Sequence, residues 1–253
     1  MQAMLIGGRA FFGRRDLKTN FQCVGGGSKS DFDVGEEVIS PYLWSRGISR
    51  LGAVAISHAH SDHVGGMRSV IANFRPHELW YGLEFPTQEF AQVAEAARSY
   101  GLDLRLHAAG DRFTFGSVRI RVLNPQPGAF ANNPAQDDES LVLHLKCGNT
   151  SALVMGDSHK RTEQLLETEN PQADLLKIGH HGSLTSSSPE FLRTVAPRYA
   201  VVSAGNYNTF RHPRPEVMHR FAERHVTTYR TNVARAVSFY LDGTTILAQL
   251  VPR

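Results

Sequence analysis

Four potential metal ligands fall within six positions of the chain, in the run His-Ala-His-Ser-Asp-His at residues 58–63. Side chains two residues apart in an extended segment point the same way, so His58 and His60 can hold one cation between them. After the turn, Asp62 and His63 can address a second cation beside the first. Neutral imidazole nitrogen and carboxylate oxygen are ligands that zinc and manganese both accept. The spacing therefore predicts a metal site.

Two later segments place the same types of ligand directly after an apolar run. Asp157 ends the run Leu-Val-Met-Gly-Asp, and a carboxylate there can bridge two cations. His180 and His181 follow the apolar run at 174–178. Functional groups collect at strand ends in α/β architectures. The three sets together favour a centre for two divalent cations, zinc or manganese.

Such a centre supports hydrolysis without a protein nucleophile. Two cations about 3.5–4 Å apart lower the pKa of a shared water toward neutrality and neutralise the charge that builds on a phosphoryl oxygen. We expect a metal-bound hydroxide to attack in line, with Asp62 or Asp157 accepting a proton. Lys177, Ser183 or His212 is expected to contact the substrate and stabilise the leaving oxygen. The sequence contains no Gly-x-Ser-x-Gly motif that would favour a serine nucleophile instead.

The elements that must position these groups alternate between strands and helices, which favours an α/β or mixed layered fold. Spacings of three and four predict helices at 62–75, 86–100, 159–168, 188–195 and 214–224. Apolar or alternating runs predict strands at 51–57, 103–107, 112–115, 117–123, 140–146, 151–156, 174–178, 199–203, 226–229, 236–240 and 244–250. A polar loop broken by prolines is expected at 124–139. Gly65 and Gly66 follow the ligand run and permit a close backbone approach.

The composition fits a globular protein. Of 253 residues, 41% are apolar and 20% are charged, which excludes disordered and collagen-like chains. No apolar run approaches 18 residues, and the start lacks the apolar core of a secretory signal, so no membrane span is expected. The two cysteines form no Cys-x-x-Cys pair, which disfavours a thiolate zinc site. We expect one domain over residues 1–253, which can still be a piece of a larger protein.

Charge is distributed unevenly along the chain. Residues 193–253 hold nine arginines, no lysine and three acidic residues, a balance of +6, whereas the whole chain carries +3. The planar guanidinium of arginine favours phosphate, so a basic end beside an anion-binding site suits nucleic acid. DNA is therefore the expected substrate and partner. Hydrolysis of a small ester, lactone or phosphodiester is the alternative, and an inactive metal-binding module is a third.

Further motifs follow one another in order along the chain. They are Asp-Val-Gly-Glu-Glu-Val at 33–38 with Pro-Tyr-Leu at 41–43, Ser-His-Ala-His-Ser-Asp-His-Val-Gly-Gly at 57–66, Asp-Glu-Ser-Leu-Val-Leu at 138–143, His-His-Gly-Ser at 180–183 and His-Pro-Arg-Pro-Glu-Val at 212–217. With Asp157 they resemble the metallo-β-lactamase superfamily, and within it the C-terminal metallo-hydrolase domain of ComEC-type DNA-uptake channel proteins. The resemblance implies a four-layer αββα sandwich with a dinuclear metal site on one edge.

The same resemblance implies a function and a set of ligands. It implies a nuclease that degrades one DNA strand while the other enters the cell, as an extracytoplasmic part of a membrane protein; a chain without such a channel would be cytoplasmic. It assigns the ligands by position: His58 and His60 to the first cation, Asp62 and His63 to the second, and Asp157 as the bridge. One of His180 and His181 would complete the second site. His212 would touch substrate or metal, unless it is only a turn residue ahead of two prolines.

The chain departs from that family in two places. Relatives start with segments of the type Asp-Val-Gly-Gln-Gly-Asp and Ile-Asp-Gly-Gly-Gly, whereas residues 4–9 read Met-Leu-Ile-Gly-Gly-Arg and residues 22–27 read Gln-Cys-Val-Gly-Gly-Gly, so residues 1–24 diverge. A further histidine for the first cation has no clear counterpart. His144 is expected to be structural, and the turn at 137–140 is the other candidate. The remaining histidines are expected to lie outside the site: His77, His107, His144, His159, His219 and His225.

Overall fold

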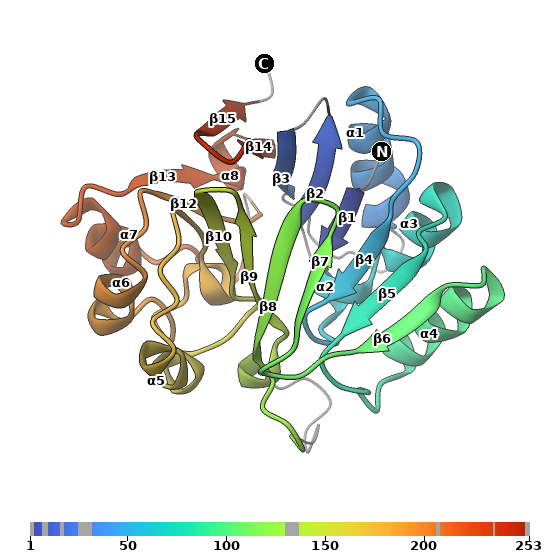
Figure 1. The fold of residues 1–253 in the computed structure, drawn as a ribbon, viewed down its shortest axis with the longest axis horizontal. Helices are drawn as coiled ribbons and strands as arrows, with labels where there is room; N and C mark the ends of the chain where they lie inside the picture. The colour runs from blue at the N-terminus through green and yellow to red at the C-terminus, as the bar shows by residue number, and fades with distance from the viewer. Residues whose placement is uncertain are drawn as a thin grey trace.

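Two β-sheets lie face to face, and helices cover the outer side of each (Figure 1). The computed structural model describes residues 3–6, 10–15, 18–24, 32–129, 137–205, 208–234 and 236–250. The predicted four-layer αββα sandwich is confirmed by this arrangement. Parts of the divergent N-terminal segments, at 7–9 and 25–27, lie outside the described residues, as does 130–136 of the predicted loop.

Within the described residues, the first sheet has the order β15-β14-β3-β2-β1-β4-β5-β6. Its strands are β1 (Ala3–Ile6), β2 (Ala10–Arg15), β3 (Lys18–Val24), β4 (Ala53–Ile56), β5 (Glu78–Tyr81), β6 (Asp103–Leu106), β14 (Ala236–Leu241) and β15 (Ile246–Leu250). The second sheet has the order β13-β12-β11-β10-β9-β8-β7. Its strands are β7 (Arg112–Phe115), β8 (Val118–Asn124), β9 (Val142–Cys147), β10 (Thr150–Val154), β11 (Leu175–Lys177), β12 (Tyr199–Val202) and β13 (Thr227–Arg230).

The helices divide between the two outer layers (Figure 1). On the first sheet lie the π-helical turn η1 (Gly35–Ile39), α1 (Ser40–Ser45), α2 (Ser61–Val64), α3 (Met67–Phe74) and α4 (Gln88–Ser99). On the second lie α5 (Lys160–Thr168), α6 (Pro189–Val195) and α7 (Pro215–Ala222). The short turns are η2 (Asp137–Glu139), η3 (Gly179–Gly182) and α8 (Thr231–Ala234).

The core consists of three apolar layers, because successive residues of a strand face opposite sides of a sheet. On β4, Val54 and Ile56 pack against the outer helices, whereas Ala53 and Ala55 face the second sheet. On β10, Leu153 joins the layer under α5 and α6. The middle layer between the sheets contains Trp80, and its indole nitrogen is satisfied by Glu78.

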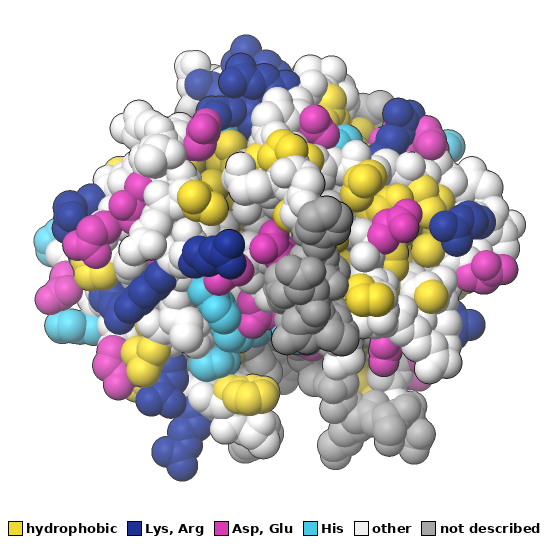
Figure 2. Space-filling view, turned by 90° about the horizontal axis from the view of Figure 1, so that it is seen from below, with side chains coloured by type: hydrophobic (Ala, Val, Ile, Leu, Met, Phe, Trp, Pro, Cys, Tyr) yellow, Lys and Arg dark blue, Asp and Glu magenta, His cyan; other side chains and the backbone are white. Residues whose placement is uncertain are grey.

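Three strands end at the same edge of this sandwich: β4 of the first sheet and β10 and β11 of the second. The sheets are joined there by a hydrogen bond of 2.8 Å from the amide of Leu141 to the carbonyl of Ser57. The parallel pairing of β10 and β11 brings their carboxyl ends side by side. Figure 2 looks onto this edge and shows histidine side chains gathered beside acidic ones.

Most predicted elements are present within a few residues of their expected ends, but the helix predicted at 62–75 is broken. It forms α2 and α3, separated by Gly65 and Gly66. The backbone of Gly66 packs directly against Gly35, where a side chain on either residue would overlap the other backbone. The predicted close approach at this glycine pair is therefore confirmed. Strands β1, β2, β3 and β5 and the η1–α1 segment were not predicted; β5 has four residues, and η1 and α1 have five and six, too few for a clear periodic pattern.

Candidate metal centre

A first cluster forms where β4 ends, from His58, His60 and Asp137. The Nε2 of His58 lies 2.9 Å from the Nδ1 of His60, and Oδ1 of Asp137 lies 3.0 Å from that same Nδ1. The hydroxyls of Ser57 and Ser140 approach the other nitrogen of His58 at 3.1 and 3.4 Å, which orients its Nε2 toward the cluster. Burial lowers the pKa of His58, so its imidazole is held neutral, as a ligand must be.

A second cluster lies beside the first and contains Asp62, His63, Asp157 and His181. The Nε2 of His181 lies 2.9 Å from Oδ2 of Asp157 and 3.1 Å from Oδ2 of Asp62. The Nε2 of His63 lies 3.3 Å from Oδ1 of Asp157. His181 donates its Nδ1 hydrogen to the carbonyl of Ser203 at 2.7 Å, which leaves Nε2 for the cluster. Of the two neighbouring histidines, His181 is the one that the structure brings to the second cluster.

Asp157 stands between the two clusters. Its carboxylate groups with His58 and His63, and it also contacts His181. Asp157 is 2% exposed, and its backbone amide donates to Ser140. Its side chain therefore lies where it contacts ligands of both clusters, and a bridging role for Asp157 stays a prediction.

The donors fit divalent cations by their charge as well as their type. Oδ1 of Asp137 and Oδ1 of Asp157 are buried and accept no hydrogen bond from any described residue. Burial alone would raise the pKa of both carboxyls, but the surrounding histidines outweigh burial and hold each pKa below its usual range. Burial also opposes the protonation of His181, yet Asp157 and Asp62 raise its pKa to about 9. The buried Asp157 and the partly buried Asp137 therefore favour positive charge at this edge, which divalent cations would supply.

A third group of ligand atoms extends the first cluster outward and contains Asp137, His159 and His180. His159 was expected to be ordinary, and that expectation is wrong: its Nε2 lies 3.1 Å from Oδ2 of Asp137. The available signal was position, since His159 comes two residues after Asp157 at the end of an apolar strand. Asp137, offered only as one candidate within its turn, is the residue shared by two of these groups. His144 is structural as expected, because its Nε2 bonds the carbonyl of Gln172.

Two of the residues predicted to contact substrate lie elsewhere. Lys177 is 5% exposed, donates to the carbonyl of Gly156 at 2.9 Å and lies 3.6 Å from Oδ1 of Asp157. Lys177 therefore supports Asp157 from the interior and does not face an incoming substrate. Ser183 is also buried, and its hydroxyl accepts from the amide and hydroxyl of Thr185. Neither side chain faces solvent: Lys177 lies on β11 with its side chain turned inward, and Ser183 is the buried residue that follows η3.

His212 lies beside the centre without joining a ligand group. Its ring meets that of His180 edge to face, with centroids 5.7 Å apart, and stacks on Phe210 at an interplanar angle of 15°. Burial and then His180 lower the pKa of His212 to about 4, so its ring is neutral at neutral pH. The loop is held by Asn208, whose side chain bonds both the amide and the carbonyl of His212.

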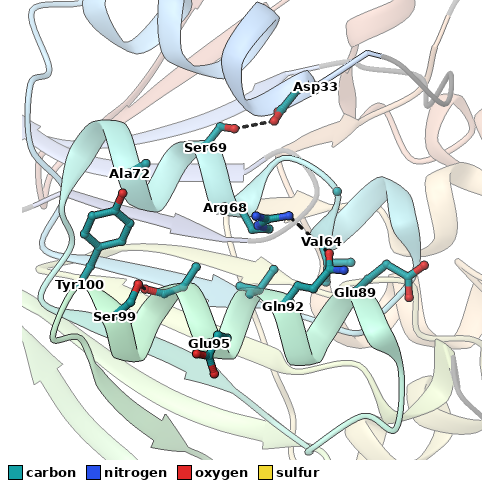
Figure 3. A pocket seen from close by; sticks show the side chains of 13 residues that line it. Asp33, Val64, Arg68, Ser69, Ala72, Glu89, Gln92, Glu95, Ser99 and Tyr100 are labelled. Carbon is teal, nitrogen blue, oxygen red and sulfur yellow. Dashed lines mark hydrogen bonds between the residues drawn. The ribbon is translucent and has the colours of Figure 1, made fainter.

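A separate groove with a volume of about 650 Å³ runs between α3 and α4 (Figure 3). The hydroxyl of Ser69 donates to Asp33, and Arg68 donates to Gln92 across it. Asp33 also accepts from the amide of Gly35 at 2.8 Å, so it ties η1 to α3. The residues that line the groove are not members of the ligand groups, and the hydrogen bonds of Asp33 hold the segment that carries Gly35 against α3.

Comparison with known proteins agrees with the fold. A family model described as the metallo-beta-lactamase superfamily matches residues 24–206. The chain belongs to the metallo-β-lactamase superfamily. A solved structure, the metallo-beta-lactamase fold protein YhfI from Bacillus subtilis, superposes with a TM-score of 0.56 at 13% identity, over 95% of this chain and 91% of that one.

More similar sequences come from proteins named for competence. The chain is 32% identical over 205 residues to ComE operon protein 3 of Bacillus subtilis (strain 168), which covers 79% of this chain and 26% of that protein. It is also 33% identical to competence protein ComA of Neisseria gonorrhoeae over 216 residues, and this match covers 83% of this chain and 28% of that protein. The chain therefore spans about a quarter of the length of these relatives. In the described residues, no helix has the length and apolar character needed to cross a membrane.

Proposed function

We propose that this protein is a metal-dependent phosphodiesterase that cuts single-stranded DNA, in DNA uptake of the competence type. The observation that carries the proposal is the pair of ligand clusters joined by Asp157 at one edge of the sandwich. Relatives named for competence support DNA as the substrate. On the same basis the protein acts beside a membrane DNA channel, outside the cytoplasm.

The ligands on this chain have distinct tasks. When bound, two divalent cations, zinc or manganese, activate a water and offset charge on the phosphoryl oxygens. His58, His60 and Asp137 would hold the first, and Asp62, His63 and His181 would hold the second, with Asp157 between them. The side chain of Asp62 is 34% exposed whereas that of Asp157 is 4% exposed, so Asp62 is the carboxylate placed to accept a proton from the attacking water.

The surroundings of His212 supply features that suit a single strand. Phe210 is 73% exposed and stacks on His212, which in turn touches His180 of the centre. An exposed aromatic ring is a platform for a nucleic acid base. Fewer arginines of the C-terminal quarter are available to bind phosphate than their number suggests. Arg220 and Arg224 already donate to the backbone carbonyls of residues 186, 187 and 189.

The test is a cleavage assay with end-labelled single-stranded and duplex oligonucleotides in Mg²⁺, Mn²⁺ or Zn²⁺. The wild-type protein should cut the single strand, and Asp62→Ala and His63→Ala should abolish cutting while circular dichroism shows a folded protein. His219→Ala on α7 is the matched control and should cut normally. Equal cutting by the two ligand variants would refute the two-metal mechanism. Bound metal with hydrolysis of bis(4-nitrophenyl) phosphate or a lactone but not DNA would identify a small-molecule hydrolase, and bound metal with no turnover would identify an inactive module.

A further inference from the structure

The third ligand group, Asp137, His159 and His180, has the residue types of a metal site of its own. Nε2 of His159 lies 2.6 Å from Nδ1 of His180, and Oδ2 of Asp137 lies 3.1 Å from that Nε2 and 3.8 Å from Nε2 of His180. The ligands of a tetrahedral zinc site, each about 2.0–2.2 Å from the ion, are about 3.4 Å from one another. One ligand atom from each of the three residues lies within 4.8 Å of the others, which is close enough for the three to share an ion after a small adjustment of the rings.

The backbone is arranged to point these rings at one another. His180 and His181 both adopt left-handed conformations, with φ of 43° and 52°, which residues other than glycine seldom do. The two successive left-handed residues turn His181 toward Asp157 and His180 toward His159. The rings of His159 and His180 stack with centroids 4.5 Å apart and an interplanar angle of 19°.

His159 is fixed from its own side. Its amide donates to Oδ1 of Asp138 at 2.8 Å, and it stands just before α5. Asp137, the residue before Asp138, directs Oδ1 to the first cluster and Oδ2 to His159. A carboxylate with one oxygen directed at each of two clusters can bridge two cations.

We propose that Asp137, His159 and His180 bind a third divalent cation, with Asp137 bridging it to the first cluster. Two imidazoles and a carboxylate favour zinc over magnesium or calcium. The three side chains are 16–29% exposed, so the site opens to solvent and leaves room for a further ligand, such as water or a phosphate oxygen. The site requires only these residues and stands whether or not DNA is the substrate.

Equilibrium dialysis against buffered zinc, followed by elemental analysis, tests the proposal. The wild-type protein should hold three zinc ions per chain, and His159→Ala should hold two. His219→Ala, which removes an exposed histidine far along the chain, should hold three. A wild-type protein that saturates at two zinc ions, or a His159→Ala variant that still holds three, would overturn the third site, whereas a wild-type protein with none would instead refute the two-metal centre of the proposed function.

Diffraction at the zinc absorption edge provides a check that does not depend on any variant. A crystal of the zinc-loaded wild-type protein should give an anomalous peak at bonding distance from Nε2 of His159, besides the two at the inner clusters. The absence of that peak, with both inner peaks present, would mean that His159 only donates a hydrogen bond to Asp137.

Discussion

Gly66 packs backbone to backbone against Gly35, and this contact fixes the turn that carries Asp62 and His63. A β-carbon on Gly66 would lie 2.8 Å from the α-carbon of Gly35, which is fixed backbone and not a movable side chain. The ligand-bearing turn is thus located by a contact with no side chain in it. The first prediction follows from this geometry.

Gly66→Ala should lower the free energy of unfolding by about 1–3 kcal/mol through overpacking, and it should also reduce bound zinc because the turn must move. Gly101→Ala is the matched control. Gly101 has a φ of +73°, and no atom lies within 4 Å of the added carbon. The substitution should therefore lower the free energy of unfolding by about 1 kcal/mol, and the variant should keep its zinc. Chemical denaturation and elemental analysis measure both effects. Normal zinc content in Gly66→Ala would show that the turn does not depend on this contact.

Asp157→Asn should reduce cleavage by more than about a hundredfold, because the amide is neutral and a poor bridge between two cations. The substitution keeps the shape of the side chain, so thermal unfolding should still be cooperative. Initial rates on a single-stranded oligonucleotide, with zinc content measured on the same samples, provide the check. Unchanged rates at full zinc content would remove Asp157 from the centre.

Lys177→Met should destabilise the metal-free protein by about 1–3 kcal/mol, because it removes one positive charge beside the buried carboxylate of Asp157, whereas His181 remains 2.9 Å away. Bound cations place positive charge on the other side of that carboxylate. Zinc should therefore stabilise Lys177→Met more than it stabilises the wild type. Unfolding curves recorded with a chelator and with zinc measure the two differences, and equal stabilisation by zinc in both proteins would contradict the role given to Lys177.

Phe210→Ala should weaken binding of single-stranded DNA by about 1–3 kcal/mol, equivalent to roughly 5- to 150-fold, if a base stacks on the exposed ring. Binding of an oligonucleotide with abasic sites should change little. Val233→Ala removes another exposed apolar side chain, 69% exposed on α8, and should leave both affinities unchanged. Fluorescence anisotropy measures the affinity of the wild type and of each variant for the normal and the abasic strand. A similar loss of affinity for the abasic strand would indicate that Phe210 acts through the loop and not through a base.

The part of the centre that could be predicted from sequence is the part that is local. His58, His60, Asp62 and His63 lie within six residues, in the segment that runs from the end of β4 through α2, so their closeness in sequence already brings them together. Asp137 and His159 meet only because η2 and the start of α5 close over the same edge. No periodicity in the chain encodes that contact.

Burial was the other property that the sequence did not reveal. Lys177 follows two leucines on β11, and nothing in that short run distinguishes a lysine that faces solvent from one that reaches back to Gly156 and Asp157. The layered fold was easier to predict, because long alternating and apolar runs such as β8 and β10 specify which face of a strand is buried. Short elements such as β5 depend on neighbours that are distant in sequence.

The first and second clusters each take ligands from both halves of the sandwich. One half, after β4, supplies His58, His60, Asp62 and His63. The other half supplies Asp137, Asp157 and His181. The separation of the sheets therefore affects how closely the ligands within each cluster approach one another. Trp80 and its neighbours fill the layer between the sheets, so their volume helps to set this separation. Changes in the volume of that layer should appear first as altered catalysis and only later as a loss of fold.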